Sequence, residues 1–134
     1  MNISTEQAKQ LAENYTKAWC SHDADAVASF YAQEGFIVKN GAEPCVGRAE
    51  IAEMAKAYFI DFPDIIVKLD GVRSTASHAI FLWTFVGTNT GPEGTGNYVD
   101  VSGWEYWHFS EDGLIAESAG HFDVDDYQKQ LDGV

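Results

Sequence analysis

The chain has 134 residues, of which 46% are hydrophobic and 13% aromatic, and 21 acidic against 8 basic residues give it a formal net charge of −13. This length predicts one domain over residues 1–134, and the aromatic content excludes a disordered chain. The negative charge argues against nucleic-acid or anionic-membrane partners, since both need a basic face. No apolar run approaches the ~20 residues of a membrane span, and the N-terminus lacks a signal-peptide pattern. A cytoplasmic protein is expected.

The first half of the chain predicts three helices. Residues 4–7 form a capping signal, and the apolar residues within 8–19 follow helical spacing. A second helix is expected from Asp23, a good N-cap, to Gly35. A short strand over 36–38 and a third helix over 47–61 follow, and a Phe-Pro-Asp stop ends the last of these helices.

The second half of the chain predicts strands. Four segments are rich in β-branched and aromatic residues and are separated by turns: 65–72, 79–87, 98–109 and 114–122. The tail at 124–131 is either a short helix or irregular. The order of elements predicts an α+β fold, with three N-terminal helices packed on a curved, mainly antiparallel sheet that leaves a hollow.

Two thiols, Cys20 and Cys45, are far apart in the sequence and belong to no CxxC motif or Cys/His cluster. Cytosolic thiols of this kind usually stay reduced, so neither a disulfide nor a zinc site is indicated. Both cysteines are interpreted as packing residues, and no metal is expected.

His121 and Asp123 stand two residues apart where the last predicted strand ends. If the strand continues through them, its period of two places both side chains on one face. In an apolar cavity, desolvation would raise the pKa of Asp123 toward the value that a general base needs, and His121 could return a proton. The pair is therefore predicted to be catalytic. The alternative is that the strand has ended by Asp123, which then only caps the final turn.

Short motifs with a consistent order run along nearly the whole chain. They are Tyr-x-x-x-Trp-x-x-His-Asp at 15–23, Phe-Pro-Asp at 62–64, Gly-Thr-Asn-Thr-Gly at 87–91 and Asp-Gly-Leu-Ile-Ala-Glu at 112–117. Together they resemble the SnoaL-like polyketide cyclase family, within the nuclear transport factor 2-like superfamily. The resemblance implies a cone-shaped α+β barrel with a deep pocket, and a homodimer formed through the outer face of the sheet.

The resemblance also implies an activity. Cyclases of this family need no metal or coenzyme, and they close a ring by an intramolecular aldol reaction in which an Asp is both acid and base. On this chain that role falls to Asp123, with His121 beside it. In the related steroid isomerases, the helix Tyr and the oxyanion-hole Asp correspond to Tyr15 and Glu105. The catalytic base of those enzymes falls near Lys39, which is no carboxylate.

Four residues are predicted to contact a substrate: Tyr15, Trp19, Glu105 and Trp107. For Glu105 the alternative is a carboxylate on the outer face of the sheet, and for Tyr15 and Trp19 it is core packing. The favoured function is a cofactor-free cyclase, isomerase or lyase that acts on a small hydrophobic molecule with carbonyl groups. The alternative is a non-catalytic module that binds a small ligand or forms a dimer.

Overall fold

The computed structural model describes residues 2–134, which form four helices and a six-stranded sheet. The helices are α1 (Thr5–Cys20), α2 (Ala24–Ala28), α3 (Gly47–Asp61) and α4 (Val124–Asp132). The strands are β1 (Tyr31–Lys39), β2 (Cys45–Val46), β3 (Ile66–Thr75), β4 (His78–Thr88), β5 (Tyr98–Phe109) and β6 (Ile115–Phe122).

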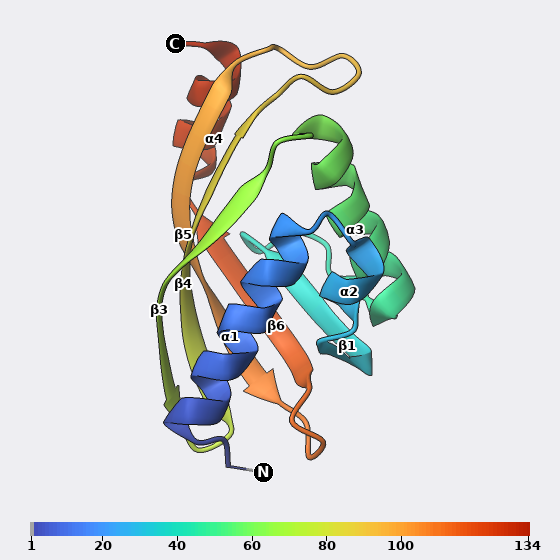
Figure 1. Cartoon of the computed structure of the whole chain (residues 1–134), viewed down its shortest axis with the longest axis vertical. Helices are drawn as coiled ribbons and strands as arrows, with labels where there is room; N and C mark the ends of the chain where they lie inside the picture. Colours follow the sequence, from blue (N-terminus) through green and yellow to red (C-terminus); the bar gives the residue numbers. More distant parts are fainter. Residues whose placement is uncertain (1) are drawn as a thin grey trace.

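The sheet has the strand order β2-β1-β6-β5-β4-β3 and is antiparallel except between β1 and β6. It curves, and α1, α2 and α3 lie on its concave side (Figure 1). The predicted α+β fold, with three N-terminal helices on a curved, mainly antiparallel sheet, is confirmed. The edge strands β2 and β3 do not pair with each other, so the sheet stays open and is not a closed barrel.

Helix α1 begins with the predicted capping box. The Gln7 amide donates to Ser4 Oγ at 3.0 Å, and the Ser4 amide donates to Gln7 Oε1 at 2.9 Å. These two bonds satisfy amides that the first helical turn leaves without partners. The apolar stripe of the helix is buried on the concave side of the sheet and ends at Trp19, at the edge of a cavity.

The second helix is shorter than the sequence suggests. Asp23 caps α2 as predicted, with its Oδ1 accepting from the Ala26 amide at 3.1 Å, but the helix ends at Ala28 and not at Gly35. Gly35 lies inside β1, where a Cβ would meet the Ile115 carbonyl oxygen at 2.6 Å. This glycine therefore allows β1 and β6 to approach closely, and it does not end a helix.

The C-terminal tail is helical and is tied to β5. Asp123 caps α4. Gln130 Oε1 accepts from the Asp100 amide at 2.7 Å, and Gln130 Nε2 donates to the Asp100 carbonyl oxygen at 3.1 Å. This attachment brings Tyr127 to the same cavity as Trp19. No helix in residues 2–134 combines the length and the apolar character that crossing a membrane requires.

Candidate functional site

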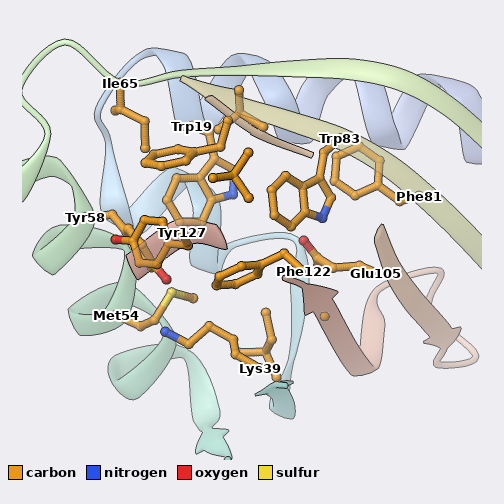
Figure 2. Close-up of a pocket in the computed structure, with 15 residues that line it drawn as sticks. Trp19, Lys39, Met54, Tyr58, Ile65, Phe81, Trp83, Glu105, Phe122 and Tyr127 are labelled. Carbon is orange, nitrogen blue, oxygen red and sulfur yellow. The ribbon is translucent and has the colours of Figure 1, made fainter. Parts of the chain in front are cut away.

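A cavity of about 90 Å³ lies between the concave face of the sheet and helices α1 and α3, with α4 at one side (Figure 2). Almost all of its lining is apolar or aromatic, and the aromatic side chains come from α1, α3, α4, β4 and β6. Two residues with ionisable acid or amine groups, Glu105 and Lys39, belong to this lining. Such a cavity has room for waters or a small molecule, and its few polar groups would orient the occupant.

Glu105 faces inward from β5 and is 9% exposed. The register places Phe81 of β4 on one side of it and Gly120 of β6 on the other. A Cβ on Gly120 would lie 3.4 Å from Glu105 Cγ. The absence of a side chain at Gly120 therefore leaves space for the Glu105 side chain on the inner face. The alternative of a carboxylate on the outer face is thus excluded.

The two oxygens of Glu105 have different surroundings. Oε1 accepts from Trp107 Nε1 at 3.0 Å and from Ser118 Oγ at 2.8 Å. No described residue donates to Oε2. Burial raises the pKa of Glu105 and outweighs these two donors, which act in the opposite direction. The neutral acid can therefore keep its proton on Oε2 and donate it to a molecule in the cavity.

Tyr15 and Trp107 pack behind the cavity and do not line it. Both are fully buried, and the Tyr15 hydroxyl lies 2.8 Å from that of Tyr31. Burial raises the pKa of both tyrosines, so they stay neutral. Of the four predicted contact residues, Trp19 and Glu105 line the cavity, whereas Tyr15 is core and Trp107 positions the Glu105 carboxyl.

His121 and Asp123 lie outside the cavity, which corrects the prediction that they share a face lining it. The strand ends at Phe122, and Asp123 is an exposed N-cap whose Oδ1 accepts from the Asp126 amide at 3.0 Å. His121 points to the outer face of the sheet, where its ring stacks on Trp104 with centroids 4.3 Å apart. Phe122, the residue between the pair, lines the cavity.

Lys39 lies on a different side of the cavity from Glu105 (Figure 2). Its Nζ is 4.9 Å from the centroid of the Tyr58 ring, and burial lowers the pKa of its amine. Tyr127 lines the cavity as well, and burial raises the pKa of its phenol to about 12. The cavity therefore offers a carboxyl group with a raised pKa on one side, and an amine with neutral phenols elsewhere.

The family model of the SnoaL-like domain matches residues 12–118. The chain belongs to this SnoaL-like family. No curated protein matches it.

Solved structures share the fold of this SnoaL-like domain at low sequence identity. A putative SnoaL-like polyketide cyclase from a Jannaschia species has a TM-score of 0.83 at 12% identity, over 100% of this chain and 99% of that one. TsrD from Streptomyces laurentii has a TM-score of 0.83 at 19% identity, over 98% and 99%. A hypothetical protein from Catenulispora acidiphila with a ketosteroid isomerase-like fold, in complex with trimethylamine, has a TM-score of 0.82 at 13% identity, over 92% of each chain.

Several residues of the SnoaL-like cavity were not among the predicted substrate contacts. They are Lys39, Met54, Tyr58, Trp83, Phe122 and Tyr127. One signal was available, because placing Glu105 on the inner face brings its β6 neighbours Ser118, Gly120 and Phe122 inside as well. Using that signal requires the β5–β6 register. Within residues 2–134, no group of three His, Cys, Asp or Glu side chains is placed to hold a metal ion.

Proposed function

We propose that this SnoaL-like domain binds a small hydrophobic molecule with a carbonyl group in the cavity and transfers protons on it, as a cofactor-independent cyclase, isomerase or lyase. One observation carries the proposal, namely a buried carboxyl group in the lining of an apolar cavity, with one oxygen held by two donors and no described donor to the other. The family resemblance supports the reaction class, since its cyclases use one carboxyl as both acid and base. Here Glu105 takes that role instead of Asp123.

The proposed chemistry uses both protonation states of Glu105. The neutral acid gives the Oε2 proton to the carbonyl oxygen of the substrate, and the carboxylate that forms is stabilised by Trp107 and Ser118. That carboxylate then takes a proton from the carbon next to the carbonyl. The result is the enol of the substrate, with no net gain or loss of protons on the enzyme. Acid–base catalysis by one positioned group is worth roughly 10²–10⁴ in rate.

Hydrogen–deuterium exchange tests the proposal without knowledge of the product. Small ketones and 1,3-dicarbonyl compounds are incubated in D₂O, and NMR follows the loss of protons on the carbon next to the carbonyl. We expect wild type to accelerate exchange for at least one compound, with a roughly 100-fold loss in Glu105→Gln. Asp123→Asn is the matched control and should keep the wild-type rate. Equal exchange in Glu105→Gln, or a loss in Asp123→Asn, would contradict the proposal.

A non-catalytic role for the same cavity is the second candidate. It would be supported if carbonyl compounds bind the cavity, as seen from shifts of the Trp19 and Trp83 indole signals, but none exchanges faster than in buffer. The apolar lining favours ligand binding in either case.

The proposed partner of the outer face of the sheet is a second copy of this chain. Ile80, Leu82 and Trp104 are 36%, 42% and 41% exposed there, on the two central strands β4 and β5. Exposed apolar side chains clustered in this way favour a protein interface. Sedimentation equilibrium should give a dimer for wild type and a monomer for Leu82→Lys. A monomeric wild type would contradict the homodimer.

A further inference from the structure

Lys39 is held in the lining of the cavity by the turn that follows it. The Asn40 amide donates to the Gly120 carbonyl oxygen at 2.8 Å, and Asn40 Oδ1 accepts from the Phe122 amide at 2.9 Å. These bonds fix the end of β1 against β6. Ile37 and Lys39, two residues apart on β1, therefore face the cavity together.

The amine of Lys39 has no carboxylate partner among the described residues. Burial lowers its pKa, and the nearby Cys45 acts in the opposite direction. Asp61 acts on the phenols of Tyr58 and Tyr127. Glu105 lies on another side of the cavity (Figure 2), and its own burial favours the neutral acid.

A half-buried ammonium in apolar surroundings is normally paired with an opposite charge, because desolvation costs the charged form several kcal/mol otherwise. The ring of Tyr58, 4.9 Å from Nζ, provides part of that stabilisation. A ligand with a negative group beside Lys39 would provide the rest. Its apolar body would then contact the aromatic walls, and the phenols of Tyr58 and Tyr127 are neutral donors in the same lining.

We infer that the cavity selects small organic anions, with a carboxylate bound by Lys39 and an unsaturated or aromatic body that directs a second oxygen to Glu105. The substrate class is thereby narrowed to oxo acids and related carbonyl-bearing carboxylates. This inference rests on the proposed function, because both concern the same cavity. Beyond that function, the substrate is an anion, although the chain itself carries a net charge of −13.

Benzoate and benzamide are suitable probes because they share one shape and differ in charge. At neutral pH, NMR titration should show wild type binding benzoate at least tenfold tighter than benzamide. Lys39→Met should abolish this preference while leaving the benzamide affinity within twofold, and Lys39→Arg should keep most of it. Lys68→Met, which removes an exposed lysine of β3, controls for the change in net charge.

Three results would overturn the inference: equal affinity of wild type for the two probes, a benzoate preference that survives in Lys39→Met, or no binding of either probe. Thermal unfolding of each variant shows whether it is folded. The exchange experiment separates this inference from the proposed function. Glu105-dependent exchange without a benzoate preference removes only the inference about charge. A Lys39-dependent preference without exchange removes only the catalytic proposal.

Discussion

The two faces of the central strands carry similar residues with different roles. On the inner face of β5, Glu105 and Trp107 are buried and joined by a hydrogen bond. On its outer face, Trp104 is 41% exposed and stacks on His121. The comparison shows that a titratable group beside an aromatic ring is not by itself a site. The inner pair, Glu105 and Trp107, differs from the outer one in being removed from water. A shift of one residue in the register of β5 would exchange the two faces.

The largest expected difference between the faces is in stability. Trp107 is fully buried and stacks on Phe81 with centroids 4.8 Å apart, so Trp107→Ala leaves a large void and removes a donor to Glu105. We expect it to lower the free energy of unfolding by about 3–5 kcal/mol. Trp104→Ala should cost about 1 kcal/mol or less in the monomer. Urea unfolding measures both values, and similar costs would contradict the assignment of faces.

The next effect is a pH dependence from Glu105. Burial raises its folded-state pKa above the reference value of 4.5. Its contribution to stability is therefore fully present below pH 4.5 and is lost as the pH rises through the folded-state pKa, by up to about 1.4 kcal/mol for each pH unit between the two values.

Glu105→Gln stays neutral at every pH, and its amide can keep an acceptor oxygen for Trp107 and Ser118. Relative to wild type, its free energy of unfolding should rise with pH above 4.5 and level off beyond the folded-state pKa. Urea unfolding across the pH range measures this difference. Glu117→Gln, an exposed change on the outer face of β6, is the matched control, because it makes the same substitution and leaves the buried Glu105 carboxyl in place. A pH-independent difference for Glu105→Gln would refute the desolvation of this carboxyl.

The smallest effect is expected at Asp123. Asp123→Ala removes the cap of α4 and should cost about 1 kcal/mol of unfolding free energy. Asp125→Ala, in the same exposed first turn, should cost less. Binding of benzoate should not change in either variant. A loss of binding in Asp123→Ala alone would return Asp123 to the candidate site.

Much of the fold could be predicted from local signals. The capping residues before α1 and α2 and the β-branched segments are signals that can be read within a few residues of the sequence. The end of α2 could not be predicted, because the apolar residues after it keep a helical spacing. In the structure Tyr31 is instead buried as the first residue of β1. The short strand β2 also has no clear signal, since two residues of pairing depend on contacts with β1.

The site was harder to predict because both faces of β5 are aromatic. Alternation over 104–107 is compatible with Glu105 inside or outside, and only the pairing with Phe81 and Gly120 decides it. His121 and Asp123 would share a face only if the strand continued through Asp123, whereas β6 ends at Phe122, and Phe122 is the residue that lines the cavity. The approach of Lys39 to Tyr58 joins β1 to α3, and no spacing within the sequence predicts it.

The central claim is that Glu105 is the desolvated acid–base group of the cavity. Its most direct test is a ¹³C NMR titration of the side-chain carboxyl groups, with the Glu105 signal assigned by its loss in Glu105→Gln. We predict that Glu105 titrates above its reference pKa of 4.5 and that a ligand in the cavity moves its titration. An ordinary pKa for Glu105, unchanged by any ligand in the cavity, would contradict the account.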